Sequence, residues 1–185
     1  MRSILFSIIM LCSFCTFAQN SKPVKLLLAG GFEFGGDEVA EVSFIGGGSQ
    51  TVDAGQGGSV FIGGQFQLPR VDLFFVRAAV GYKYVTTVAE NVNIRMTRIP
   101  LHLTGHYRVT DDIHVGGGLV SHQNVRFKVD DLEAVTFDNA AGFRLEAGWK
   151  GLALTYTNLG YRSETGENYD ASSLGVSFSV AIPRK

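Results

Sequence analysis

Cysteine is almost missing from this chain of 185 residues: its two copies, Cys12 and Cys15, both fall within the first 18 residues. If those residues are removed on export, as argued below, the rest of the chain holds no thiol. That excludes a disulfide, a thiolate metal site and a cysteine nucleophile. The chain also has no excess of either charge, with 16 Lys and Arg against 17 Asp and Glu, so nothing favours nucleic acid as a partner.

Long apolar runs are missing as well. Beyond residue 18 no stretch approaches the roughly 18 apolar residues that a membrane-spanning helix needs, and no useful amphipathic helix is evident. The short apolar run 4–11 follows Arg2 and precedes small residues at Thr16 and Ala18, which is the pattern of an export signal. We therefore predict a signal peptide over 1–18, cleaved near Ala18, and a single mature domain over 19–185.

The remaining sequence alternates between apolar and polar residues and is rich in glycine, with 23 copies, which is typical of β-strands joined by glycine-rich turns. The pattern predicts eight strands, over 24–34, 57–68, 71–84, 94–108, 113–125, 136–149, 152–161 and 171–182. Their connections alternate strictly between tight and long, which is the layout of an all-β, closed, antiparallel up-and-down barrel. The first long connection holds a small hairpin, 41–45 with 49–53, and ten strands are the alternative if this hairpin joins the wall.

The composition of the two faces indicates which one points outward. In the last strand Leu174, Val176 and Phe178 share one face, whereas Ser173 and Ser177 lie on the other. Small residues on the polar face fit the narrow interior of an eight-stranded barrel, whereas a face toward water would favour Lys, Glu and Thr. We therefore expect the polar face inside and the apolar face outside, as in a transmembrane barrel.

The placement of aromatic residues agrees with this orientation. Two belts are predicted on the apolar face, as membrane interfaces select. The belt near the tight turns holds Phe66, Phe74, Tyr107 and Trp149, and the belt near the long loops holds Phe34, Tyr82, Tyr84 and Phe137. Short turns on one side and long loops on the other, together with an export signal, are also typical of outer-membrane barrels.

Several stretches carry a resemblance to known proteins: LLLAGGFEFGGDEVAEVSF, AGQGGSVFIGGQF, RAAVGYKYVTT, RIPLHLTGHYRV and HVGGGLVSH. Over essentially the whole mature chain, the sequence resembles small eight-stranded outer-membrane barrels of the OmpA membrane-domain and OmpX type. The resemblance implies a monomer in the outer membrane of a Gram-negative bacterium. It also implies contact with outer-membrane lipid, lipopolysaccharide and the barrel-assembly machinery.

The polar face carries a set of charged and imidazole side chains that would meet in the lumen: Glu33, Arg77, Arg98, His102, His106, His114, His122, Arg144 and Glu146. Hairpin symmetry about Thr110 predicts His106 opposite His114 and Arg98 opposite His122, and the next connection places Glu146 beside His114. One interpretation is a metal site or a pH-dependent gate. The favoured interpretation is a charge-paired lumen that plugs the barrel, without metal or cofactor.

No catalytic constellation is evident. Ser121 and His122 lie near the loop end, as in lipid A acyl-modifying barrels, but adjacent strand residues point to opposite faces. Acidic loop residues are read either as a divalent-cation site or, preferably, as a solvated rim: Asp130, Asp131, Glu133, Glu164, Glu167 and Asp170. We expect a non-enzymatic structural or surface-interaction role through the outer loops, with hairpin 41–53 as the main projecting element. The alternatives are a narrow pore, a lipid-modifying enzyme and a soluble periplasmic ligand-binding barrel.

Overall fold

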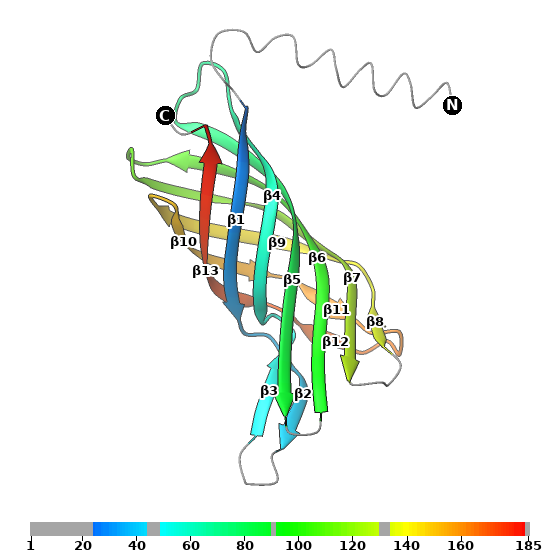
Figure 1. The fold of residues 1–185 in the computed structure, drawn as a ribbon. Helices are drawn as coiled ribbons and strands as arrows, with labels where there is room; N and C mark the ends of the chain where they lie inside the picture. Colours follow the sequence, from blue (N-terminus) through cyan, green and yellow to red (C-terminus); the bar gives the residue numbers. More distant parts are fainter. Residues whose placement is uncertain (1–23, 44–48, 90–91, 130–133, 184–185) are drawn as a thin grey trace, which may run out of the picture.

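The computed structural model describes residues 24–43, 49–89, 92–129 and 134–183 (Figure 1). Every regular element in these ranges is a β-strand. None of the described residues forms a helix long and apolar enough to cross a membrane. The predicted signal peptide, 1–18, lies outside the described residues, and so do the acidic loop residues Asp130, Asp131 and Glu133.

Eight antiparallel strands close into a barrel, which confirms the predicted fold. They follow one another around the wall in chain order, and the last strand pairs with the first to complete the ring. The wall consists of β1 (Val24–Phe34), β4 (Gly57–Gln67), β5 (Phe74–Ala89), β6 (Val92–Arg108), β7 (Ile113–Val129), β9 (Ala140–Trp149), β10 (Leu152–Asn158) and β13 (Ser173–Ile182). The tight turns lie at the end of the barrel that is uppermost in Figure 1, and the long connections lie at the opposite end.

The hairpin in the first long connection does not join the wall. Its strands, β2 (Glu38–Ser43) and β3 (Ser49–Asp53), form a two-stranded sheet of their own that projects from the long-loop end (Figure 1). The alternative of ten wall strands is therefore wrong. A second small hairpin at the same end consists of β11 (Gly160–Arg162) and β12 (Asn168–Asp170).

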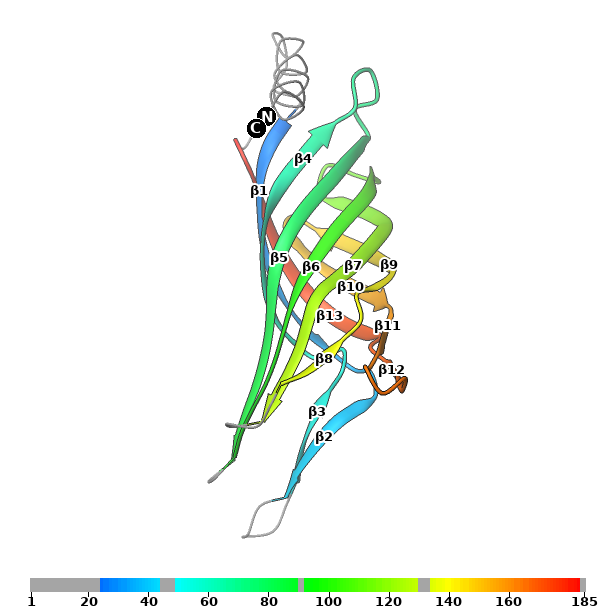
Figure 2. The ribbon, with the colours of Figure 1, turned by 90° about the vertical axis from the view of Figure 1, so that its right-hand side faces the viewer.

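Strands β5, β6 and β7 extend beyond the rest of the wall at the long-loop end (Figure 2). There β7 pairs with β8 (Val135–Phe137) rather than with β9, so the predicted strand 136–149 is interrupted at 138–139. The interruption faces Asn124, whose φ of 52° lies in the left-handed region that asparagine tolerates better than most residues. The Asn124 backbone N–H donates to Oδ1 of Asn139 at 3.3 Å, which ties the two irregular positions together.

The apolar face of the wall points outward, as predicted. Leu101, Leu154 and Val176 are 41%, 67% and 51% exposed, whereas Arg98 and His106 on the polar face are 1% and 0% exposed. A protein that buried its apolar face would show the opposite pattern. The barrel is therefore inverted relative to a soluble one, because its charged side chains lie inside and its apolar side chains lie outside.

Seven of the eight predicted belt aromatics lie exposed on the outside, namely Phe66, Phe74, Tyr107, Trp149, Phe34, Tyr82 and Tyr84. The eighth prediction, Phe137, is wrong, because this ring is only 8% exposed and packs against Tyr161 and Tyr169. The irregularity at Asn124 and at 138–139 reverses which alternate residues face inward, since β7 buries His122 before it and Val125 after it. A strict period of two, carried through 136–149, could not anticipate this reversal.

A compact apolar cluster fills the long-loop end. Its buried members are Val52, Ala54, Val85, Ile94, Met96, Val120, Val125, Phe127, Phe137, Ala140, Leu159, Tyr161 and Ala171. Burying each large apolar side chain contributes roughly 1.5–3 kcal/mol. The extended strands and their connections are thus held together by an apolar core of their own, which adjoins the charged middle of the barrel.

Candidate functional site in the barrel lumen

All nine residues predicted for the lumen line the inside of the barrel, and two carboxylates organise most of them. Glu33 of β1 lies toward the long-loop end, and Glu146 of β9 lies toward the tight-turn end. Arg144 lies between the two, donating to Glu33 at 2.5 Å with its Nε 4.0 Å from Glu146. The lumen therefore contains one continuous chain of ion pairs rather than isolated charges.

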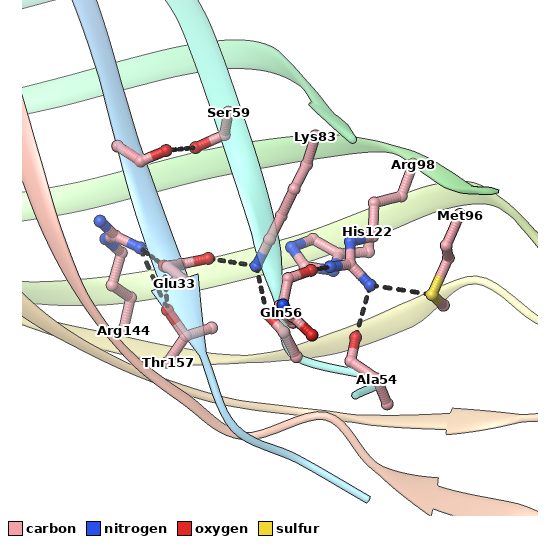
Figure 3. Close-up of polar contacts among 12 residues, drawn as sticks. Glu33, Ala54, Gln56, Ser59, Lys83, Met96, Arg98, His122, Arg144 and Thr157 are labelled. Carbon is pink, nitrogen blue, oxygen red and sulfur yellow. Dashed lines mark hydrogen bonds and ion pairs between the residues drawn. The ribbon is translucent and has the colours of Figure 1, made fainter. Parts of the chain in front are cut away.

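Glu33 is the more deeply buried of the two carboxylates. Its Oε1 accepts hydrogen bonds from Arg144 and, at 3.1 Å, from the Thr157 hydroxyl, and its Oε2 accepts one from Lys83 (Figure 3). A carboxylate buried in protein is tolerated only when its lone pairs meet cations or other donors in this way. The cluster joins β1, β5, β9 and β10 across the lumen.

The chain segment 54–57 lies inside the barrel just beyond this cluster. The carbonyl of Ala54 accepts a hydrogen bond from Arg98 at 2.5 Å, the Gln56 carbonyl accepts a second from the same guanidinium, and the Gly55 carbonyl accepts one from Lys83 at 2.6 Å (Figure 3). A Cβ on Gly55 would lie 2.6 Å from the carbonyl oxygen of Gly35, so only glycine fits there. Two buried cations, Lys83 and Arg98, thus hold the segment 54–57 inside the barrel.

The second carboxylate, Glu146, gathers the groups nearest the tight turns. Its Oε1 accepts from Arg77 at 3.1 Å and lies 3.2 Å from His114 Nε2 and 4.0 Å from His106 Nδ1. The predicted His106, His114 and Glu146 cluster therefore forms, and its ligand atoms all lie within 4.8 Å of one another. Among the residues that the structure describes, these three have ligand atoms close enough together to hold one metal ion.

The strand register behind this cluster differs from the prediction. His106 pairs with Gly116, not with His114, and His122 pairs with Pro100, not with Arg98. The turn is centred one residue later than predicted, because Thr110 Oγ1 accepts the backbone N–H groups of Asp112 and Ile113 at 3.3 and 3.0 Å. The resulting shift of two residues keeps every side chain on its predicted face, so the cluster survives.

Several members of the network were not predicted as site residues, among them Lys83, Thr157 and Tyr161. Lys83 lies on the same alternating polar face as Arg77, which was a usable signal. Tyr161 lies at the long-loop end, with its hydroxyl 2.5 Å from His122 Nδ1 and its ring 5.8 Å from the guanidinium of Arg98. Nothing local marks Tyr161, because its burial depends on the distant strands that pack over it.

The Ser121 hydroxyl has no histidine placed to activate it as a nucleophile among its hydrogen-bond partners in the described residues. Its hydroxyl donates to the carbonyl of Ala140 at 2.8 Å and accepts from Gln123 at 2.7 Å, while the neighbouring His122 imidazole lies at the Tyr161 hydroxyl. Acyl transfer requires the nucleophile within hydrogen-bond reach of its base. Here the serine and the histidine belong to separate networks.

The described acidic loop residues each interact with a nearby donor rather than with one another. Glu164 accepts from Thr136, and Glu167 accepts from Tyr169 at 2.8 Å. The backbone N–H of Ser172 donates to Asp170 at 2.8 Å. Hydrogen bonding by the Ser172 side chain, together with this backbone contact, lowers the pKa of the Asp170 carboxyl. All three carboxylates are exposed to solvent at the long-loop end.

No family model matches this sequence, and no curated protein shows significant similarity to it. Among solved structures, the fold is similar to Neisserial surface protein A, with a TM-score of 0.51 and 13% identity over 85% of this chain and 96% of that one. Ail, the attachment invasion locus protein of Yersinia pestis, gives a TM-score of 0.47 at 8% identity, covering 85% of this chain and 97% of the other. The N-terminal β-barrel domain of Pseudomonas aeruginosa OprF gives 0.38 at 18% identity, covering 84% and 97%.

The ring of eight strands, its exposed apolar wall and the match to Neisserial surface protein A define the class of fold. This protein has the fold of the small eight-stranded outer-membrane β-barrels.

Proposed function

We propose that this chain is an integral outer-membrane protein of a Gram-negative bacterium, exported by the segment 1–18 and functional as the mature barrel 19–185. Its role is structural or surface-interacting rather than enzymatic, and it acts as a monomer with a closed lumen. The observation that carries the proposal is the apolar outer wall around a core of paired charges.

The height of the apolar wall suits a bilayer. On β5 the outward-facing side chains run from Phe74 to Tyr84, about ten residue steps or roughly 33 Å along a strand at ~3.3 Å per residue. With the ~40° tilt usual in such barrels, this corresponds to about 25 Å along the membrane normal, which is the height of their apolar band. A soluble periplasmic barrel has no reason to expose such a band.

The asymmetry of the two ends gives the orientation. The tight turns, which outer-membrane barrels place in the periplasm, lie at one end, and the β2–β3 and β11–β12 hairpins lie at the other (Figure 1). We therefore place the extended parts of β5, β6 and β7 outside the cell. Their own apolar core keeps this end ordered, so it can present a fixed surface to an extracellular ligand.

The outer wall above the belt also suits contact with lipopolysaccharide. Arg95 and Arg126 are exposed there, and Lys128 is the cross-strand partner of Arg95. None of the three makes an ion pair with another described residue. Basic side chains just beyond an aromatic belt would meet the phosphate groups of the outer leaflet.

The contacts inside the barrel argue against a pore. The segment 54–57 lies inside the barrel, and Lys83, Arg98 and Arg144 form hydrogen bonds with it and with Glu33 (Figure 3). An ion would have to displace these pairs to pass. We therefore expect planar bilayers containing the folded protein to stay silent, and steady single-channel conductance would support the pore instead.

Cysteine labelling tests the location and the orientation together, because the predicted mature chain contains no cysteine of its own. Glu167→Cys on the long-loop side should react with a membrane-impermeant maleimide on intact cells. The matched variant Asp111→Cys, in a tight turn, should react only after the outer membrane is opened. Equal labelling of both variants, or reaction of neither in membrane-bound protein, would reject the proposed arrangement.

A further inference from the structure

Three side chains with metal-binding chemistry converge at the tight-turn end of the lumen. They come from consecutive wall strands: His106 from β6, His114 from β7 and Glu146 from β9. The geometry points to a binding site for a divalent transition-metal ion, with His106 Nδ1, His114 Nε2 and a Glu146 oxygen as ligands. The site is argued from these contacts alone, and only the side of the membrane that it faces rests on the proposed function.

Both ring nitrogens of His106 are placed as a metal ligand requires. Its Nε2 lies 2.8 Å from the Thr104 hydroxyl, while Nδ1 is buried and has no hydrogen-bond partner among the described residues. If Nε2–H donates to Thr104, the lone pair of Nδ1 is left pointing toward Glu146. Metal-binding histidines are commonly held in this way, with the second ring nitrogen donating to a neighbouring group.

The orientation of the imidazoles is fixed by an aromatic ring and by two glycines. Phe75 stacks on His106 with the planes 3° apart and the centroids separated by 4.9 Å. A Cβ on Gly116 would lie 2.3 Å from His106 Nδ1, and a Cβ on Gly148 would lie 2.1 Å from His114. Each imidazole therefore occupies space that only glycine on the neighbouring strand leaves free. Gly116 of β7 and Gly148 of β9 thus have a specific role in shaping the site.

The donor set and the space beside it suit zinc or a similar ion. Zinc binds imidazole nitrogen and carboxylate oxygen at about 2.0–2.2 Å, and a site with three protein ligands takes water as the fourth. Modest closure of the present separations brings the three atoms to such distances. A cavity of about 540 Å³ lies at the tight-turn end, with His114 in its lining, and supplies both a route of entry and room for the water.

Arg77 is the competitor for this site. Its guanidinium bonds Glu146 Oε1 at 3.1 Å and also donates from Nε to Gln65 at 3.0 Å. Arg77 lines the same cavity, so it can leave Glu146 for water while Gln65 still holds it. The metal ion and the Arg77 guanidinium would then compete for the Glu146 carboxylate. Removing the arginine charge should consequently tighten metal binding.

The test uses the folded wild-type barrel in detergent micelles, titrated with Zn²⁺ by calorimetry, and with Co²⁺ followed by its visible absorption. We expect one equivalent of Zn²⁺ to bind, with His114→Gln and Glu146→Gln each weakening binding at least tenfold. Arg77→Gln should bind more tightly than the wild type. The matched control His102→Gln, which removes a lumen histidine outside the cluster, should bind as the wild type does.

Histidine NMR of the unmutated protein provides a readout that needs no variant to fold. Zinc should shift the ring-proton signals of His106 and His114 and leave those of His102 and His122 in place. Absence of zinc binding by the folded wild type would overturn the inference. Binding that shifts none of the predicted signals, or that survives both His114→Gln and Glu146→Gln unchanged, would overturn it as well.

Discussion

Replacing Glu33 by Gln should destabilise the barrel more than any other single charge neutralisation in the lumen. The carboxylate is the shared acceptor for Lys83, Arg144 and Thr157. The variant leaves Lys83 without its counter-charge and Arg144 with only its 4.0 Å contact to Glu146. Breaking a buried ion pair by removing one partner costs about 3–5 kcal/mol. Because glutamine retains one acceptor oxygen, we expect a loss near the lower end, about 3 kcal/mol, in the free energy of unfolding.

The matched control is Glu146→Gln. Its main partners Arg77 and His114 line the cavity at the tight-turn end, where water can solvate them, so we expect a loss of only about 1–2 kcal/mol. Urea unfolding of the refolded barrel in lipid vesicles measures both losses, with the fluorescence of Trp149, the one tryptophan of the chain, as the signal. Adding Lys83→Met to Glu33→Gln should recover part of the loss. Wild-type stability of Glu33→Gln, or a further full loss in the double variant, would show that the lumen pairs do not carry the stability assigned to them.

Four further variants probe other parts of the structure. Arg98→Ala removes the donor that holds the Ala54 and Gln56 carbonyls, so hydrogen exchange in 54–57 should speed up at least tenfold, and unchanged protection would reject the tether. Leu103→Arg places a charge on the apolar wall and should cost about 2–4 kcal/mol in urea titrations of the vesicle-inserted protein; no cost would mean that this side chain does not face lipid. Gly142→Ala, whose Cβ would lie 1.9 Å from a carbonyl oxygen, should lower the folded yield far more than Gly117→Ala, whose nearest neighbour is a movable leucine side chain 3.0 Å away, and equal yields would contradict the close strand approach. Finally, Ser121→Ala should leave the lipid A mass spectrum of producing cells unchanged, whereas loss of a modified species would support the alternative of a lipid-modifying enzyme.

The wall and its facing were predictable because they follow from local pattern. The period of two, the small residues opposite Val176 and Phe178, and the alternation of short and long connections each depend only on neighbours in the chain. These features identified the number of wall strands, the outward apolar face and nine of the residues that line the lumen.

The contacts within the lumen were less predictable, because they depend on distant parts of the chain. Lys83 meets Glu33 across 50 positions, and Arg98 meets the carbonyl of Ala54 across 44. The shift of two residues at the Thr110 turn and the reversal of facing at Asn124 are set by side chains that hydrogen-bond the backbone. Such bonds change the strand register, or the face on which Phe137 lies, and the apolar pattern of the sequence does not reveal them.

The position of the apolar wall in lipid can be measured by separating cell membranes and comparing boiled with unboiled samples on a detergent gel. A closed barrel that resists detergent until heated should be found in the outer-membrane fraction and should migrate differently before and after boiling. Recovery in the soluble periplasm, with one mobility in both samples, would mean that the exposed face carrying Leu101, Leu154 and Val176 does not meet a bilayer.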